Sequence, residues 1–233
     1  MNRPYIICHM VMSIDGKVTG NYLYTPECEA AVQHYYEINR EFHADAYACG
    51  RITMEGSFTG GWQPDLRPYQ NIPMERTDYI ADTKTGFYAV AFDRRGKLGW
   101  KSPKIVDEDP GYGGAHIIEV LCENVSDAYL AYLQHIGVSY LFAGETELNI
   151  PLALEKLKTQ FGIQTLLLEG GSILNGAFLK ESLVDQLSLV LVPIVAETGD
   201  KPLFYESTLT GYELTKASPL EKGCLWLQYK SAI

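Results

Sequence analysis

Regular alternation of apolar runs and helical patterns in the second half of the chain limits its fold more than any other feature. Three apolar runs are typical of buried strands, namely VSYLFAG (138–144), IQTLLLE (163–169) and DQLSLVLVPIV (185–195). Apolar residues at helical spacing predict helices at 126–135, 150–161 and 172–181. Strands that alternate with helices predict a mostly parallel sheet with helices on both faces.

The rest of the chain continues this pattern. Strands are expected at 5–12, 44–50, 87–93 and 116–122, and a helix is expected from the Thr25-Pro26 pair to about Phe42. Residues 56–76 are rich in Gly and Pro and predict a long loop, a kind of segment that is often functional. Two alternating runs predict a C-terminal antiparallel strand pair at 211–218 and 223–230. Because no linker interrupts the pattern, we expect a single domain over residues 1–233.

Composition and charge narrow the classes of function. The chain is 46% hydrophobic, and 19 basic and 29 acidic residues give a formal net charge of −10. This acidic excess argues against nucleic-acid and anionic-membrane surfaces. Five cysteines without a C-x-x-C pair indicate a reducing compartment, and the apolar stretch near the N-terminus is too short for a membrane span. We therefore expect a cytoplasmic protein that acts on a small molecule, with neither a membrane nor a nucleic acid as partner.

Two segments place glycines and hydroxyl groups just after a predicted strand. They are Gly50-Arg51-Ile52-Thr53 and Glu169-Gly170-Gly171-Ser172, with Ser172 as the expected N-cap of the next helix. Backbone N–H groups at helix starts can bind an anion, so two such loops at one sheet edge would suit a dinucleotide diphosphate. Arg51 and Arg94 could add charge for a further phosphate. The pattern alone equally permits two ordinary strand-to-helix turns.

The turn Asp15-Gly16-Lys17, after the first strand, carries another candidate pair of charges. Its carboxylate and ammonium could position a polar substrate or relay a proton, although Asp-Gly is also simply a tight turn. The five histidines have no H-x-H or H-E-x-x-H spacing, so we expect no metal site. No G-x-S-x-G motif supports serine hydrolysis.

Three segments together resemble the reductase domain of bacterial and archaeal riboflavin biosynthesis, which has a dihydrofolate-reductase-like fold. They are PYIICHMVMSIDGK (4–17), ACGRIT (48–53) and LLLEGGSILNGAFLKESLVDQLSLVLVPIV (166–195). The third is the specific one, because it matches over its whole length in order and spacing. GRITME (50–55) also resembles the G-R-x-T-x-E element with which dihydrofolate reductases hold the NADPH phosphates. The resemblance implies a three-layer α/β sandwich.

The same resemblance implies an NADPH-dependent reductase of a 5-amino-6-(5-phosphoribosylamino)uracil-type pyrimidine. It implies that Thr53 and the segment 171–177, which contains Ile173 and Leu174, contact the nucleotide. Met12 and Ser13 would line the nicotinamide, and Arg40 could bind the substrate phosphate. Glu169 would face the substrate, and we expect it and Asp15 to place the substrate's polar groups.

One departure from the family concerns the substrate. Family members carry an Asp-Asp-Pro stretch leading to Leu-Thr and Arg, where this chain has MEGSFTGGWQPDLRPY (54–69), with Arg67 as a candidate replacement. Two alternatives therefore stay open. One is a reductase of a pterin, dihydrofolate or another small heterocycle on the same fold, and the other is a nucleotide-binding protein without turnover.

The C-terminal part of the chain also predicts its assembly. The long apolar strand at 185–195 and the final strand pair create a sheet edge that must be covered. Related reductases pair through such a region. We therefore expect a homodimer.

Overall fold

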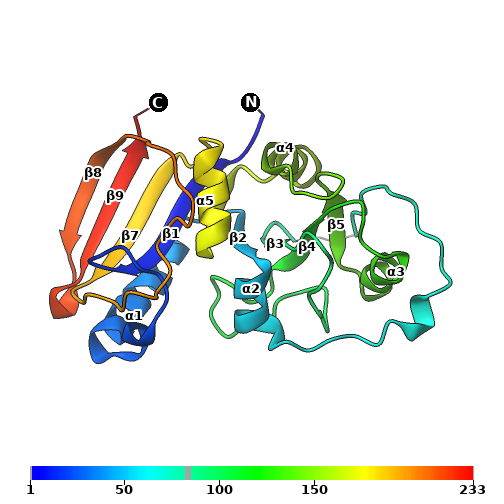
Figure 1. Ribbon diagram of the computed structural model, residues 1–233, viewed down its shortest axis with the longest axis horizontal. Coiled ribbons are helices and arrows are strands. Elements are labelled where there is room, and N and C mark those ends of the chain that lie inside the picture. The colour runs from blue at the N-terminus through cyan, green and yellow to red at the C-terminus, as the bar shows by residue number, and fades with distance from the viewer. Residues whose placement is uncertain (1, 82–84, 233) are drawn as a thin grey trace. The chain divides into compact units, whose positions relative to one another are not determined.

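The computed structural model describes residues 2–81 and 85–232, which divide into two compact units (Figure 1). The first unit comprises Asp45–Gln164 with the N-terminal segment up to Pro4, and the second comprises Tyr5–Ala44 and Thr165–Ile233. The expectation of a single domain over residues 1–233 stays a prediction.

The described residues of the first unit form four parallel strands in the order β5-β4-β3-β2. They are β2 (Ala46–Gly50), β3 (Tyr88–Phe92), β4 (His116–Leu121) and β5 (Ser139–Phe142). The last three are buried at every position, which is why their sequences are mostly continuous apolar runs. β2 and β3 end together, since Gly50 pairs with Phe92. The residues that follow them, Arg51 and Asp93, therefore leave the sheet at the same edge.

The two longer helices of the first unit begin and end close to the predicted ranges 126–135 and 150–161, and a short helix precedes them in the chain. They are α2 (Arg51–Met54), α3 (Asp127–Ile136) and α4 (Ile150–Phe161). The Ser126 hydroxyl caps α3, and Gly162 ends α4 with a φ of 73°, a left-handed conformation that glycine adopts without a steric penalty. The predicted loop at 56–76 contains only short turns, a π-helical one at Glu55–Thr59 and a 3₁₀ one at Arg67–Tyr69.

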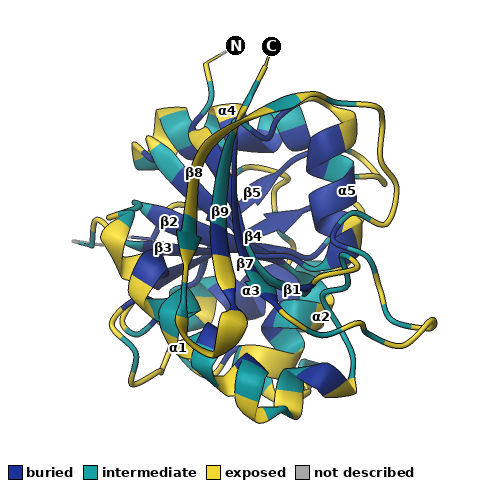
Figure 2. Ribbon diagram, turned by 90° about the vertical axis from the view of Figure 1, so that its left-hand side faces the viewer, coloured by how far each residue is buried: buried dark blue, intermediate teal, exposed yellow. Residues whose placement is uncertain are grey.

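In the second unit, the part that the structure describes forms five strands in the order β6-β1-β7-β9-β8. They are β1 (Tyr5–Ser13), β6 (Thr165–Leu168), β7 (Gln186–Val192), β8 (Tyr212–Pro219) and β9 (Leu225–Ser231). β6 and β7 run parallel to β1, while β9 is antiparallel to both β7 and β8. Cys8 pairs with Leu168, so Glu169 leaves β6 beside the middle of β1. β8 is largely exposed (Figure 2).

Two helices accompany these strands, α1 (Pro26–Glu41) and α5 (Ser172–Lys180), with 3₁₀ turns at Asn21–Tyr24 and Glu221–Gly223. The Thr25 hydroxyl accepts a hydrogen bond from the Cys28 N–H and Pro26 occupies the first turn, as predicted. α1 contacts β1 and β7. Its buried face joins a core cluster with Val190, Val192 and Trp226.

The structure confirms the predicted α/β class, since both units combine parallel strands with helices and the C-terminal strands form the expected antiparallel pair. One local prediction is wrong. The N-cap of α5 is Gly171, and Ser172 is the first helical residue, because its buried hydroxyl donates to the Pro202 carbonyl at 2.5 Å instead of capping the helix. In the described part of the chain, no helix is long and apolar enough to span a membrane.

Candidate functional site

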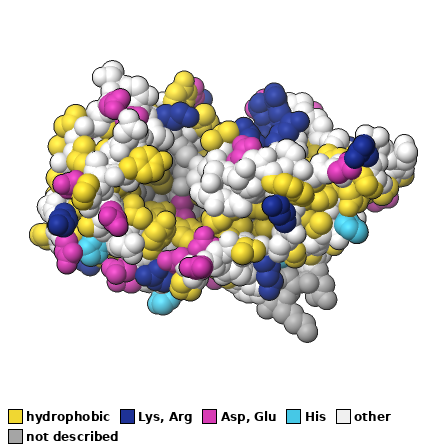
Figure 3. All heavy atoms as spheres, turned by 90° about the horizontal axis from the view of Figure 1, so that it is seen from below, with side chains coloured by type: hydrophobic (Ala, Val, Ile, Leu, Met, Phe, Trp, Pro, Cys, Tyr) yellow, Lys and Arg dark blue, Asp and Glu magenta, His cyan; other side chains and the backbone are white. Residues whose placement is uncertain are grey.

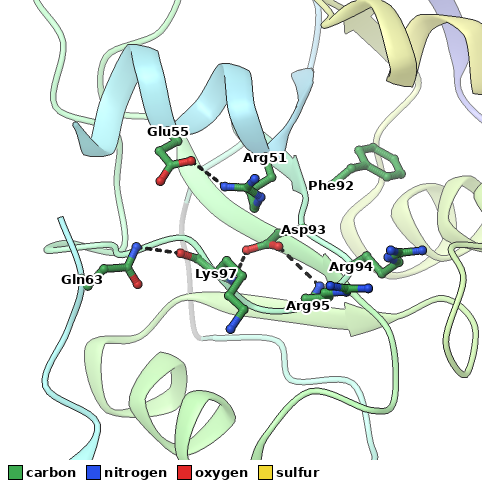
Figure 4. A pocket seen from close by; sticks show the side chains of 8 residues that line it. All are labelled: Arg51, Glu55, Gln63, Phe92, Asp93, Arg94, Arg95 and Lys97. Carbon is green, nitrogen blue, oxygen red and sulfur yellow. Dashed lines mark hydrogen bonds and ion pairs between the residues drawn. The ribbon is translucent and has the colours of Figure 1, made fainter. Parts of the chain in front are cut away.

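A pocket in the first unit lies at the edge where β2 and β3 end (Figure 4). Its volume is about 570 Å³, and its lining residues are Arg51, Glu55, Gln63, Phe92, Asp93, Arg94, Arg95 and Lys97. Arg51 and Arg94, the two predicted phosphate ligands, therefore share one pocket. Four of the lining side chains are cationic and two are carboxylates, so the pocket has a net positive charge within a chain of net charge −10.

The loop that follows β3 is organised by the carboxylate of Asp93. This buried side chain accepts hydrogen bonds from the backbone N–H groups of Lys97, Leu98 (2.7 Å) and Arg95 (3.4 Å). Burial raises the pKa of Asp93, and the backbone donors offset part of that rise. The chain thus turns around Asp93 and lines the pocket with the basic side chains of the loop (Figure 4).

Two of the pocket's arginines are already paired with glutamates. Arg51 Nη1 lies 2.5 Å from Glu55 Oε2, and Arg94 Nη1 donates to Glu147 Oε2. Within the described ranges, the pocket's other two basic side chains form no ion pair, and both are exposed. A phosphate group bound in this pocket would therefore contact two cations that form no ion pair with the described residues and two arginines that are already paired with a glutamate.

A second carboxylate is buried on the adjacent strand, where Glu119 pairs in register with Ala91 of β3. Trp100 Nε1 donates to Glu119 Oε1, and Tyr129 Oη lies 3.2 Å from the same oxygen. Glu119 Oε2 has no hydrogen-bond partner among the residues that the structure describes. Burial, and then the charge of Asp93, raise the pKa of Glu119 well above its ordinary value. Burial thus favours the protonated, uncharged form of this side chain.

In the second unit, Glu169 follows β6 directly and is only 6% exposed. Asn39, a buried residue of α1, donates from Nδ2 to Glu169 Oε1 at 2.6 Å. The thiol of Cys8 is also close. Its pKa is raised, first by burial and then by the charge of Glu169, so the sulfur stays protonated and uncharged. The carboxylate of Glu169, a predicted site residue, is thus held by the neutral side-chain amide of Asn39.

The two glycines after Glu169 shape the start of α5. Gly170 has a φ of 94°, and a Cβ added there would lie 3.3 Å from Met10 Cε. The Gly170–Gly171 peptide bond is cis. Beyond them, Ser172 and Leu174 are buried, whereas Ile173 is 66% exposed. Of these three predicted nucleotide contacts, the side chain of Ile173 alone is presented to solvent.

The turn after β1 is tied together by side-chain hydrogen bonds. Ser13 Oγ donates to Asp15 Oδ1 at 2.6 Å, the N–H of Ala196 donates to the same oxygen at 3.0 Å, and the N–H of Lys17 donates to Ser13 Oγ at 2.9 Å. The Ser13 hydrogen bond, followed by that of Ala196, lowers the pKa of Asp15. Asp15 is therefore a carboxylate at neutral pH. It can accept a hydrogen bond from a ligand but has no proton to give.

The predicted site residues form two sets, one in each unit. The set in the first unit is Gly50, Arg51, Thr53 and Arg94, and the set in the second is Met12, Ser13, Asp15, Lys17, Arg40, Glu169, Gly170, Gly171, Ser172, Ile173 and Leu174. Met12 and Lys17 are half-buried, and Arg40 is exposed. Arg67, the candidate replacement for the family's arginine, pairs with Asp65 at 2.7 Å.

Sequence reasoning missed Asn39, Asp93 and the neighbours of Arg94 in the pocket loop. The sequence could have indicated Asn39, because it follows Ile38 in the predicted helix. An asparagine that is buried in such a helix needs a hydrogen-bond partner. Asp93 was predicted only as the last residue of the strand at 87–93. Among the described residues, no three potential ligands gather that could hold a metal ion, and the expectation of no metal stays a prediction.

Comparisons with known proteins agree on one family. The model of the family described as RibD C-terminal domain matches residues 105–225. A protein of Aquifex aeolicus named 2,5-diamino-6-ribosylamino-4(3H)-pyrimidinone 5′-phosphate reductase is 22% identical over 220 residues, which are 91% of this chain and 85% of that protein. A protein of the same name from Methanothermobacter thermautotrophicus is 26% identical over 201 residues, or 85% of this chain and 82% of that protein.

Solved structures show that the fold is shared. A pyrimidine reductase-like protein from Corynebacterium diphtheriae has a TM-score of 0.69 at 19% identity, over 100% of this chain and 93% of that chain. RibD of Acinetobacter baumannii has a TM-score of 0.66 at 21% identity, over 100% of this chain and 59% of that chain. A riboflavin biosynthesis reductase of Saccharomyces cerevisiae has a TM-score of 0.61 at 16% identity and is covered to 91%.

Proposed function

Because this chain belongs to the RibD C-terminal domain family, we propose that it is an NADPH-dependent reductase of a ribosylamino-pyrimidine 5′-phosphate in riboflavin biosynthesis. Relatives that match most of the chain are named as reductases of a 2,5-diamino-4(3H)-pyrimidinone of this kind. The sequence led us to expect the corresponding 5-aminouracil, which differs by an oxo group in place of the 2-amino group. Both compounds belong to the same substrate class.

The observation that carries the choice of cofactor is the pocket of the first unit. Arg51, Arg94, Arg95 and Lys97 line one cavity in a chain that is acidic as a whole. Guanidinium groups bind phosphate oxygens through paired, charge-assisted hydrogen bonds. This pocket fits the adenosine 2′-phosphate that distinguishes NADPH from NADH.

The reduction of a ring-opened ribosylimine adds a hydride to carbon and a proton to nitrogen. Bound nicotinamide supplies the hydride. In our proposal the carboxylate of Glu169, fixed by Asn39, accepts a hydrogen bond from an amino N–H of the pyrimidine. Asp15 is ionised and serves as an acceptor that orients the substrate, so the proton comes from another group or from water. Arg40, which is exposed at the end of α1, is proposed to meet the substrate phosphate.

The assembly and location of the protein are part of the same proposal. β8 is an exposed strand next to β9 (Figure 2), and such an edge is commonly covered by a partner. We propose a homodimer in the cytoplasm. On the face drawn in Figure 3, basic side chains occur in separate groups among acidic and apolar ones, unlike the continuous basic stripe of a nucleic-acid surface.

An NADPH oxidation screen tests the proposed function. The purified chain is incubated with NADPH and, in turn, the diamino-pyrimidinone phosphate, the aminouracil phosphate and dihydrofolate. Oxidation with either pyrimidine supports the proposal and identifies the substrate. Oxidation with dihydrofolate alone would assign the protein to pterin reduction, and binding of NADPH without turnover would make it a nucleotide-binding protein.

A further inference from the structure

We propose that Glu55 determines how strongly the pocket discriminates between phosphorylated and unphosphorylated nucleotides. Its carboxylate lies against the guanidinium of Arg51 inside the pocket, so a ligand phosphate must compete with it for the same cation. This inference rests on the proposed function, because it takes the pocket to be the site of the adenosine 2′-phosphate. Arg51 and the other cations of the pocket create the preference for NADPH, and Glu55 weakens it.

The local backbone fixes this competition. Glu55 follows Arg51 by four residues, a spacing that brings two side chains together on one helical face. The chain is helical over this span, through α2 and the π-helical turn that follows it. The contact between Arg51 Nη1 and Glu55 Oε2 is 2.5 Å, and the two side chains are 34% and 29% exposed. Figure 4 shows them pointing toward each other on the pocket wall.

The other ion pair of the pocket differs in one respect. Glu147, the partner of Arg94, is 78% exposed and is not one of the pocket-lining residues. Its carboxylate can move into solvent when a phosphate approaches Arg94. Glu55 lines the pocket and is partly buried, so its charge stays beside any ligand that Arg51 binds.

The sign of the effect follows from the charges. A phosphate monoester carries nearly two negative charges at neutral pH and is repelled by a fixed carboxylate. A ribose 2′-hydroxyl is neutral, and a carboxylate can accept its hydrogen bond, as acidic residues do in NAD-binding sites. Glu55 therefore favours the unphosphorylated ribose, while Arg51 and the neighbouring cations favour the phosphate. The observed preference will be the balance of these two tendencies.

The test is the Glu55→Gln variant, which keeps the side-chain shape and removes the charge. Dissociation constants for NADPH, NADH and adenosine 2′,5′-bisphosphate are measured by titration calorimetry, together with the midpoint of thermal unfolding. We expect the dissociation constants of NADPH and the bisphosphate to fall about three- to tenfold, with that of NADH unchanged or raised. The gain should shrink as salt is added, because partly exposed charges are screened.

Asp65→Asn is the matched control. Asp65 also pairs with an arginine, Arg67, but it lies outside the pocket lining, so its loss should leave the ratio of the two affinities unchanged. A Glu55→Gln protein that unfolds at lower temperature with an unchanged NADPH-to-NADH ratio would overturn the inference and leave Glu55 as a helix-stabilising residue. If the wild-type chain binds neither nucleotide, the proposed function itself fails, and this inference fails with it.

Discussion

Asn39 Nδ2 lies 2.6 Å from Glu169 Oε1, joining the end of α1 to the end of β6 across 130 positions of sequence. Both side chains are buried. A buried carboxylate is stabilised when an amide donates to it, because the hydrogen bond replaces part of the lost hydration. This contact fixes one oxygen of Glu169 and so sets the direction in which the carboxylate faces.

The first prediction concerns the charge of Glu169. Glu169→Gln keeps the shape of the side chain but removes the carboxylate that we propose for the substrate N–H. Turnover should fall by about 10²-fold, as for a positioned polar group in a reaction, while the NADPH dissociation constant stays within about twofold, since the phosphate pocket is formed by other residues. Steady-state kinetics and calorimetric titration measure the two quantities separately. A parallel loss of both would indicate that the segment is structural.

The second prediction concerns Asn39. Asn39→Asp would place two carboxylates against each other in a buried position, whereas Asn39→Ala only removes the donor. We expect the free energy of unfolding to fall by about 1–3 kcal/mol in the alanine variant and further in the aspartate variant at neutral pH. Lowering the pH should restore part of the aspartate variant's loss, because one of the two carboxylates then becomes protonated. Urea unfolding at two pH values checks this, and equal losses at both would contradict it.

The third prediction concerns the cofactor. Arg51→Ala removes a cation from the pocket, and a charge-assisted hydrogen bond is worth about 1.5–3 kcal/mol. NADPH binding should therefore weaken about tenfold or more, with little change for NADH. The wild-type chain should prefer NADPH, and equal affinity of the wild type for both nucleotides would contradict the assignment of the pocket.

The fourth prediction concerns His9, a fully buried residue of β1. Its Nδ1 lies 3.0 Å from Ser188 Oγ, its Nε2 lies 3.0 Å from the Tyr35 carbonyl, and its ring stacks on Tyr35. Burial lowers the pKa of His9 from 6.5 to about 4. As the pH falls from about 6.5 to about 4, the unfolded chain therefore takes up a proton that the folded chain refuses.

His9 thus contributes stability that is present above pH 6.5 and is lost toward pH 4, by about 3 kcal/mol over the whole interval. The pKa of His116 is also lowered, so the wild type loses stability at low pH for a second reason. The test therefore compares how steeply the free energy of unfolding depends on pH in the variant and in the wild type. The free energy of unfolding of His9→Gln should depend less steeply on pH between 6.5 and 4 than that of the wild type. Identical slopes in urea unfolding would exclude this role of His9.

The sequence predicts much of the fold because its signals are local. Thr25, Ser126 and Gly162 act on backbone groups within a few residues, and the structure confirms all three helix boundaries. The prediction that Ser172 is the N-cap of α5 was wrong because of a contact that is distant in the sequence. The hydroxyl of Ser172 is used by the carbonyl of Pro202, thirty positions away, and no local pattern encodes that partner.

The candidate site was less predictable than the fold, because its contacts also join residues that no local pattern connects. The positions of its glycines and arginines after predicted strands indicated that they belong to the site. The side chains and backbone groups that position them could not be predicted. Asp93 belongs to a turn that many sequences would form, and its role appears only when the loop wraps around the buried carboxylate. Arg51 and Glu55 are the exception, since their spacing is visible in GRITME and needs only the helical turn to bring them together.

Transfer of deuterium from labelled NADPH to the product would demonstrate the proposed hydride transfer itself. The chain is incubated with NADPH carrying deuterium at C4 of the nicotinamide, on either face, and with each of the two ribosylamino-pyrimidine phosphates. We expect that one labelled form yields a ribitylamino product that is heavier by one deuterium in mass spectrometry. Absence of a reduced product with either pyrimidine, or a product that carries no deuterium from either labelled form, would contradict it.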